Sequence, residues 1–574
     1  MSHDPAHESR SDASTTLLTL AAEAWDLVMA AYPVFATSIG DRRFDDRLSN
    51  PAAEATASTL RRLATLRDRA QAIDVHDLTG ADGVTHSALV AFIDMEADLI
   101  GADHERWAIN PLDGPQVEFL NIGSFQRVET PADGDRMLAR WRAMDPWIEQ
   151  HTRNVVVALE VGIVSPEAPI RRVIAELDDL LARPTADSPL LGPARVERPR
   201  WSATETQRFG SGLETVVVEQ IHPAFQRYRE VLRDVVLPRA RSNDRPGLSA
   251  IPGGVETYRR LARAHTSLDL APEEIHQIGL AEVARIDAEL RELAGRVLGT
   301  PDLAAALRRL RDDPALHFAT PGQVFETAES ALARANAAIP GWFGTLPLAP
   351  CQVVEMAAHE ASHSTIAYYR QPAADGSRSG QYYLNTTAPE TRPRYEAEAL
   401  AFHEAVPGHH LQIAIAQELT GLPDFRRHAG TTAFIEGWGL YAERLADEMG
   451  LYGGDLDRIG IASFNGWRAC RLVVDTGMHA LGWSRQRAID FMVEHTALAT
   501  NNIENEVDRY ISMPGQALAY KLGQLELLRL RAEARAALGA DFDMRRFHDV
   551  VLGQGALPLA TLRTVVDSWL AGVG

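Results

Sequence analysis

The segment that decides how this chain folds reads His403-Glu404-Ala405-Val406-Pro407-Gly408-His409-His410. On an unbroken α-helix, His403 and His409 would lie on different faces, and residues seven apart are about 10 Å apart along the axis. Pro407 cannot donate a helical hydrogen bond, and Gly408 tolerates backbone angles that other residues avoid. We therefore expect the helix to break at this Pro-Gly pair, bringing the second histidine back toward the first.

Two histidines and a downstream glutamate around such a break form a typical set of zinc ligands. Glu436 lies in an apolar and aromatic helical segment, where a buried carboxylate needs a partner. Three protein ligands leave the fourth position of a tetrahedral zinc open for water. We predict a Zn2+ site made by His403, His409 and Glu436, with His410 as the alternative to His409. Glu443 follows two turns later on the same face, and we favour a solvated side chain over a neighbour of the ligands.

A literal HExxH sequence, His359-Glu360-Ala361-Ser362-His363, competes for the same role. Histidines at positions i and i+4 of a helix share one face and can bind one ion. However, the motif runs directly into the strand-like residues 364–369 and lies between Pro350 and Pro372, so no strongly helical stretch supports it. We interpret it as a chance match.

The residues around the predicted zinc indicate hydrolysis by an activated water. A bound zinc lowers the pKa of its water, and Glu404 is placed to accept the proton and deliver it to the leaving amine. Tyr520, one turn after Gln516, is the candidate donor to the oxyanion, with an ordinary core tyrosine as the alternative. Asn385, on a predicted edge strand that would hold the substrate backbone, is a weaker candidate.

Three further side chains are candidates for binding the substrate. Lys521 is the single lysine among 57 basic residues, and an arginine fork cannot replace a compact ammonium in a tight pocket. Arg509 and Lys521 flank the segment around Tyr520 and could hold a substrate carboxylate. His479 is a further candidate donor, with a packed or capped histidine as the alternative.

Most of the chain has the periodicity of amphipathic helix. Apolar residues recur at three- and four-residue spacing in residues 17–29, 53–72, 137–159, 272–297 and 517–538. Strand formers gather in residues 352–354, 365–369 and 381–385. We therefore expect a mainly α fold with a small β-sheet beside the helix that carries the metal site. The predicted division is a disordered tail (1–16), an N-terminal helical lobe (17–345), a β region with a substrate edge strand (346–395) and a C-terminal helical metal-site lobe (396–574).

Composition argues against several classes of partner. The net charge of −21 disfavours nucleic acid, because phosphate binding requires a basic surface. The two cysteines, Cys351 and Cys470, are too few for a disulfide framework. Residues 1–16 are polar and resemble no secretory signal, and no apolar run is long enough to span a membrane. We therefore expect a cytoplasmic protein that binds neither nucleic acid nor membrane.

The chain resembles the bacterial family called domain of unknown function 885 (DUF885). The family motif HExxPGH corresponds to residues 403–409, and its E-G-W-x-x-Y-x-E segment corresponds to residues 436–443. The similarity extends from about residue 32 to the C-terminus, with specific blocks at 474–483, 506–510 and 514–523. The resemblance implies a largely helical, zincin-like (gluzincin-type) metalloprotein with a deep channel between helical lobes. It also favours His409 over His410 as the ligand and has no counterpart to the sequence 359–363.

The predicted site favours a zinc-dependent hydrolase. We expect a metallopeptidase that cleaves short peptides, with carboxypeptidase action as one form. Two alternatives stay open, a zinc amide hydrolase acting on a small non-peptide molecule and a non-catalytic helical protein that binds a metal. The expected partners are Zn2+ and a peptide or small amide substrate, and a homodimer stays open.

Overall fold

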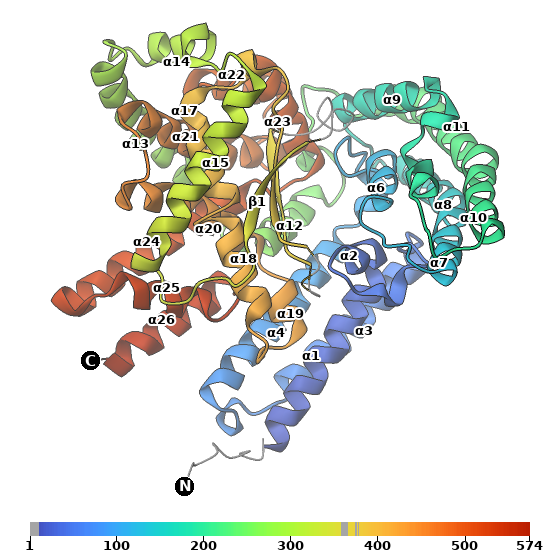
Figure 1. Ribbon diagram of the computed structural model, residues 1–574, viewed down its shortest axis with the longest axis horizontal. Helices are drawn as coiled ribbons and strands as arrows, with labels where there is room; N and C mark the ends of the chain where they lie inside the picture. The colour runs from blue at the N-terminus through green and yellow to red at the C-terminus, as the bar shows by residue number, and fades with distance from the viewer. Residues whose placement is uncertain (1–10, 357–365, 374–375, 377, 574) are drawn as a thin grey trace.

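Four of the five predicted helices are observed with nearly the predicted bounds. The computed structural model describes residues 11–356, 366–373, 376 and 378–573, and it is mainly helical (Figure 1). The matching helices are α1 (Asp12–Ala31), α3 (Ala53–Gln71), α13 (Pro272–Val297) and α24 (Leu518–Leu538). The fifth segment is divided at Ala143 into α7 (Pro131–Arg142) and α8 (Met144–Leu159). The helix breaks there because Pro146 cannot donate the hydrogen bond that would continue α7.

Helix α1 begins inside the segment 1–16 that was expected to be disordered. Ser11 caps the helix, and its side-chain oxygen accepts a hydrogen bond of 3.1 Å from the backbone amide of Ser14. Such a cap satisfies one of the free amides at a helix start. Residues 12–16 are therefore helical, whereas residues 1–10 lie outside the described part of the chain.

The other helices of the N-terminal half fall into three groups. Next to α1 and α3 lie α2 (Pro33–Ser38) and α4 (Gly80–Gly101). A separate group on the right of Figure 1 contains α7 and α8 together with α6 (Pro115–Ile122), α9 (Glu167–Ala182), α10 (Ala203–Val216) and α11 (His222–Val231). The short helix α5 (His104–Trp107) contacts α8. The chain then passes through α12 (Gly254–Thr266), α13, α14 (Leu303–Asp312) and α15 (Pro321–Ala338).

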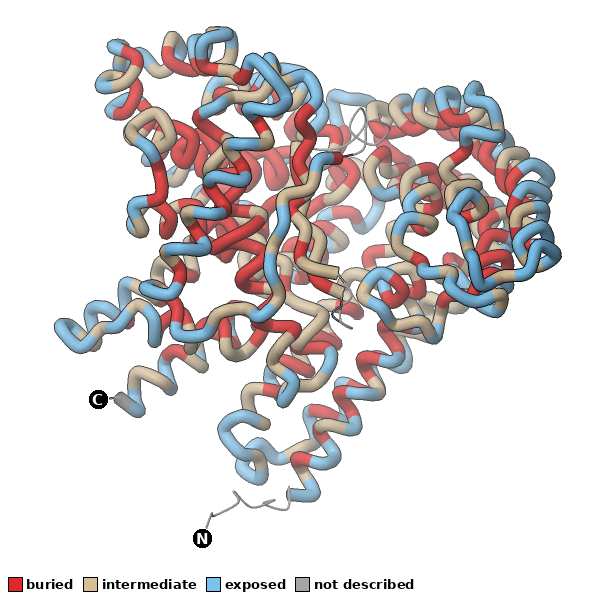
Figure 2. Tube along the Cα trace, viewed as in Figure 1, coloured by how far each residue is buried: buried red, intermediate tan, exposed pale blue. Residues whose placement is uncertain are grey.

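Two large apolar cores underlie this arrangement, and their buried residues form red stretches in Figure 2. One core lies within residues 109–236 and belongs to the separate group of helices. The larger core joins residues of α1, α3 and α4 to residues 283–566. Buried contacts therefore cross the expected lobe boundary at residue 345, and the division of the chain into lobes stays a prediction.

Three short strands form the small sheet that the sequence predicts. The strands are β1 (Cys351–Glu355), β2 (Ala367–Arg370) and β3 (Gly380–Leu384), in the order β1-β3-β2. β3 pairs in parallel with β1 and antiparallel with β2. Every second residue of β3 is buried, because successive side chains of a strand point to opposite faces of the sheet. Asn385 follows this central strand directly, so it does not lie on an edge strand as expected.

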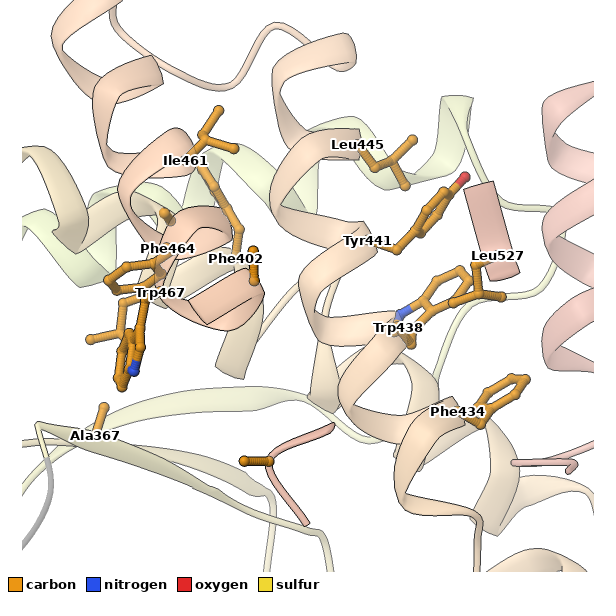
Figure 3. Close-up of a cluster of buried hydrophobic side chains, with 14 of the residues drawn as sticks. Ala367, Phe402, Phe434, Trp438, Tyr441, Leu445, Ile461, Phe464, Trp467 and Leu527 are labelled. Carbon is orange, nitrogen blue, oxygen red and sulfur yellow. The ribbon is translucent and has the colours of Figure 1, made fainter. Parts of the chain in front are cut away.

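The C-terminal half supplies the helices around the candidate site. They are α17 (Arg394–Glu404), α18 (His409–Glu418), α19 (Asp424–His428), α20 (Thr432–Glu448), α21 (Asp455–His479), α22 (Arg485–His495), α23 (Thr500–Ser512), α25 (Met544–Leu552) and α26 (Leu559–Val573). Figure 3 shows Phe402 of α17, Trp438 of α20 and Phe464 of α21 in one buried apolar cluster. Within the described residues, no helix combines the length and the apolar character needed to cross a bilayer.

Glycines set the distance between α20 and α24. A Cβ at Gly437 would lie 2.5 Å from the backbone carbonyl carbon of Gly523, and a Cβ at Gly523 would lie 1.8 Å from the carbonyl oxygen of Ala433. The two helix backbones therefore touch, since no side chain separates them. This close contact brings Glu436 of α20 and Tyr520 of α24 to the same part of the molecule.

Candidate metal centre

The helix breaks at the Pro-Gly pair as the sequence predicts. α17 ends at Glu404 and α18 begins at His409, and the Val406–Pro407 peptide bond between them is cis. The indole nitrogen of Trp438 donates a hydrogen bond of 2.9 Å to the carbonyl oxygen of Pro407, which ties the turn to α20. A Cβ at Gly408 would lie 1.9 Å from the carbonyl oxygen of His403, so only glycine fits this turn.

The turn brings His403 and His409 together against Glu436. One ligand atom from each of the three residues lies within 4.8 Å of the other two. Oε2 of Glu436 is 3.7 Å from Nε2 of His403 and 3.4 Å from Nε2 of His409. Ligands about 2 Å from a tetrahedral ion are separated by about 3.3 Å. The three side chains therefore fit a single metal ion with tetrahedral geometry.

Glu443 contacts the ring nitrogen of His403 that does not face Glu436. The expectation that Glu443 is a solvated side chain is therefore wrong. The Glu443 carboxylate is fully buried, and its Oε1 lies 2.8 Å from Nδ1 of His403. A histidine that donates from Nδ1 to a carboxylate presents the lone pair of Nε2 to a metal. Gly439 leaves room for this ring, because a Cβ there would lie 2.7 Å from Cε1 of His403.

The carboxylates make this position favourable for a cation. Burial lowers the pKa of His403, but its hydrogen bonds to Glu436 and Glu443 outweigh burial and raise that pKa to about 9. Burial would raise the pKa of Glu436, yet its contacts with His403 and His409 hold it well below its usual range. The ligand cluster is therefore electrostatically prepared for positive charge, which a metal ion would provide.

His410, the alternative ligand, is engaged elsewhere. Its Nδ1 lies 3.0 Å from the hydroxyl of Tyr369 on β2, and its Nε2 lies 2.9 Å from the carbonyl oxygen of Ala349. Gly380 makes room for the ring, because a Cβ there would lie 2.4 Å from Nδ1. Both ring nitrogens have partners within the protein, so His410 ties the helix to the sheet and leaves the metal position to His409.

Glu404 and Tyr520 lie next to the three ligands. Glu404 follows His403 at the end of α17, and its negative charge adds to burial in raising the pKa of Tyr382 on β3. The Tyr520 ring stacks on the His403 ring with centroids 6.4 Å apart and planes at 17°. Burial, followed by the nearby charge of Glu436, raises the pKa of Tyr520. Both predicted catalytic side chains thus come within the surroundings of the metal cluster.

Lys521 and His479 lie in the core with their polar atoms paired. Lys521 is fully buried, and its Nζ donates to Asn465 at 2.9 Å and to Gln524 at 2.7 Å. His479 is also fully buried; its Nδ1 accepts from the amide of Leu248 and its Nε2 donates to a backbone carbonyl. Neither side chain presents a free group to a substrate, so their expected binding roles are not part of the proposal below.

Arg509 also forms hydrogen bonds within the protein, and it lies beside two buried arginines that the sequence analysis did not single out. Its guanidinium donates to Glu506 and, at 2.8 Å, to Oε1 of Gln516. Beside it, Arg468 and Arg471 of α21 are buried, and both contain nitrogen atoms without partners. Two arginines three residues apart in the mainly apolar segment 459–474 were the available sequence signal. The literal HExxH at residues 359–363 lies outside the described residues.

Two solved structures are similar to this chain along nearly its whole length. A protein from Colwellia psychrerythraea, provisionally described as a lipoprotein, matches with a TM-score of 0.91 and 26% identity over 98% of this chain and 99% of that one. A protein from Shewanella oneidensis, provisionally described as a lipoprotein of unknown function, matches with a TM-score of 0.71 and 18% identity over 96% and 99% of the two chains.

More distant matches add no argument about activity. A carboxypeptidase from Pyrococcus furiosus matches with a TM-score of 0.38 and 10% identity, over 97% of this chain and 99% of that one, which is too little to carry an argument. No curated protein matches the chain. The model of the family described as "Bacterial protein of unknown function (DUF885)" matches residues 33–566, which span both the HExxPGH turn and the Glu436 helix. The chain therefore belongs to the DUF885 family.

Proposed function

We propose that this chain is a zinc-dependent metallopeptidase that hydrolyses short peptides. The observation that carries the proposal is the meeting of His403, His409 and Glu436, whose ligand atoms lie within 4.8 Å of one another. Two imidazoles and one glutamate are the ligands of a well-known class of hydrolytic zinc sites, in which a fourth position stays open for water. The buried Glu443 adds the carboxylate that such sites use to orient a histidine ligand.

Each neighbouring side chain has a defined part in the proposed reaction. A zinc ion bound by the three ligands would polarise the scissile carbonyl and lower the pKa of a bound water. Glu404 takes a proton from the attacking water and passes it to the leaving amine. The Tyr520 hydroxyl donates a hydrogen bond to the carbonyl oxygen as that atom gains negative charge. Its raised pKa keeps this hydroxyl protonated and able to donate.

The proposal also includes a fold class, the zincin-like architecture. A zincin-like, gluzincin-type arrangement is supported by the His-Glu pair at the end of α17 and by the third ligand on the later helix α20. The contact between the sheet and α17 supports it further. The deep channel, the cytoplasmic location and the homodimer stay predictions, and the names of the two structural relatives lend the cytoplasmic location no support.

Zinc content and hydrolysis in matched variants test the proposal. Glu404→Gln should keep bound zinc and lose hydrolysis by on the order of a thousandfold, because it removes the proton acceptor. His409→Ala should lose zinc, whereas the neighbouring His410→Gln should keep it. Metal content is measured by mass spectrometry and hydrolysis with a mixed peptide library. Unchanged turnover in Glu404→Gln would overturn the mechanism, and zinc that is lost in His363→Ala but kept in His409→Ala would restore the HExxH at 359–363.

A further inference from the structure

Arg468 and Arg471 of α21 are buried cations with unsatisfied hydrogen-bond donors. Their side chains belong to residues that are only 4% and 3% exposed. Nε and Nη1 of Arg468 and Nη1 of Arg471 have no hydrogen-bond partner among the described residues. Arginine stays charged in proteins, and a buried charge without a partner is strongly destabilising. Arg471 forms an ion pair of 3.0 Å with Glu506, so its unbonded donor is Nη1 alone, whereas Arg468 has two unbonded nitrogen atoms. These buried donors on adjacent turns are suited to binding an anion.

Aromatic rings hold the two guanidinium groups without neutralising them. The Trp467 ring centroid lies 4.2 Å from Cζ of Arg468 and 4.4 Å from Cζ of Arg471. Phe464 adds a second ring 4.4 Å from Arg468. These cation–π contacts fix the positions of the two groups, yet they leave N–H donors free for a ligand. Figure 3 shows Phe464 and Trp467 projecting from α21 next to Phe402 of α17, the helix that ends in the metal motif.

The Tyr520 ring lies next to both the arginine pair and the candidate metal ligand His403. Cζ of Arg471 is 4.3 Å and Cζ of Arg468 is 5.9 Å from the ring centroid of Tyr520. The His403 ring also neighbours the Tyr520 ring, with its centroid at 6.4 Å. A peptide residue spans at most about 3.6 Å. A carboxylate held by the arginines would therefore belong to a residue one or two positions beyond a peptide bond at the metal.

The carboxylates near the pair leave nitrogen atoms of both arginines without a hydrogen bond. The charge of Glu506 acts on Arg468 and on Arg471, and the charge of Glu443 acts on Arg468 as well. The Glu506 carboxylate is already shared, since it accepts hydrogen bonds from Arg471, Arg509 and the hydroxyl of Tyr510. No described carboxylate lies within ion-pair distance of Arg468. The hydrogen bonds of Arg509 go to Glu506 and Gln516. The nitrogen atoms without a hydrogen-bond partner belong to Arg468 and Arg471.

We infer that Arg468 and Arg471 bind the terminal carboxylate of a peptide substrate, so that the proposed peptidase removes one or two residues from the C-terminal end of short peptides. This inference rests on the proposed function for its reaction, but the carboxylate site itself does not depend on hydrolysis. Planar guanidinium groups match a carboxylate through paired hydrogen bonds. An amidated C-terminus offers neither the charge nor two acceptor oxygens, so it should be bound poorly.

A pair of peptides that differ only in a free or an amidated C-terminus tests the inference. The full-length, zinc-loaded protein should hydrolyse the free acid with a kcat/KM at least tenfold higher than that for the amide. Arg468→Gln should reduce this ratio to near one through a higher KM for the acid. Arg468 has no ion pair to break, which makes it the better position for substitution. Arg241→Gln, a comparably buried arginine that also has nitrogen atoms without partners, is the matched control and should keep the ratio.

Binding to the Glu404→Gln protein separates this inference from the proposed function. Calorimetric titration should show at least tenfold tighter binding of the acid than of the amide, and Arg468→Gln in the same background should abolish the difference. Equal binding of both peptides, or a preference that survives the Arg468 substitution, would overturn the carboxylate site. A preference in binding without hydrolysis by the zinc-loaded wild type would uphold the site and refute the peptidase. If Arg468→Gln fails to fold, Arg471→Lys, which keeps the charge but removes the fork, should lower the preference severalfold.

Discussion

Replacing Glu443 tests whether the candidate site is built for a metal. In Glu443→Gln the fully buried acceptor of His403 loses its charge, while its shape and an acceptor oxygen remain. A hydrogen bond to a charged group contributes about 1.5–3 kcal/mol. Loss of a carboxylate that orients a metal-bound histidine weakens metal affinity about 10–100-fold. Since the amide keeps one acceptor, we expect zinc affinity to fall by about tenfold in Glu443→Gln and by about a hundredfold in Glu443→Ala.

Competition with a chromophoric chelator at fixed pH measures this loss. Glu448→Gln is the matched control, because Glu448 lies on the same helix, is partly exposed and pairs with Arg531 rather than with a ligand. The control should keep the wild-type zinc affinity. If Glu443→Gln binds zinc as tightly as the control does, the carboxylate does not orient His403 and the reasoning behind the site fails.

Three further predictions follow from the packing of the site. Gly439→Ala should displace the His403 ring, because the added methyl group would lie 2.7 Å from Cε1 of that ring. We expect this variant to lose zinc and to lose about 1–3 kcal/mol of unfolding free energy in urea. Gly210→Ala, which has open space at its Cβ, is the control and should change neither quantity. Tyr520→Phe should lower kcat by about 100-fold or more with unchanged zinc content, and equal kinetics in the two proteins would remove the hydroxyl from the reaction. Burial lowers the pKa of Lys521 to about 7 in the folded protein. Between pH 7 and about 10.5 this lysine is therefore protonated in the unfolded chain but neutral in the folded protein. The free energy of unfolding should rise with pH in that window, because the unfolded state binds more protons. Lys521→Met should flatten this rise, and parallel curves for both proteins would show that the lysine is not responsible.

Local chemistry was enough to predict the broken helix and the meeting of His403, His409 and Glu436. Pro407 and Gly408 act on the backbone next to them, so their effect is readable from their own identities. His403, His409 and Glu436 are residue types with few other uses in an apolar helical surrounding. The five amphipathic segments were predicted for the same reason, since helical periodicity reflects which face is buried. The break at Ala143 shows the limit, because one proline outweighed an otherwise continuous pattern.

Burial and pairing depend on what packs against each residue, and those features were not readable from the chain alone. The spacing of Glu436 and Glu443 places both on one face of α20, but it does not say that α17 covers the second carboxylate. The strand order β1-β3-β2 likewise depends on pairing between distant segments, so the strand before Asn385 was taken for an edge.

The unpaired arginines show how such a tertiary feature can indicate function. In the sequence, Arg468 and Arg471 look like any surface arginine. Buried nitrogen atoms without a hydrogen bond, which Arg241 shares, together with their contacts with the Tyr520 ring set them apart. Selection for stability alone would disfavour such groups, because buried donors without a hydrogen-bond partner cost free energy in the folded state. A ligand that pairs with them recovers this free energy on binding, and its binding therefore stabilises the protein. The two arginines thus lie where they would bind the carboxylate of the proposed substrate, on the ring of Tyr520 that also neighbours the candidate metal ligand His403.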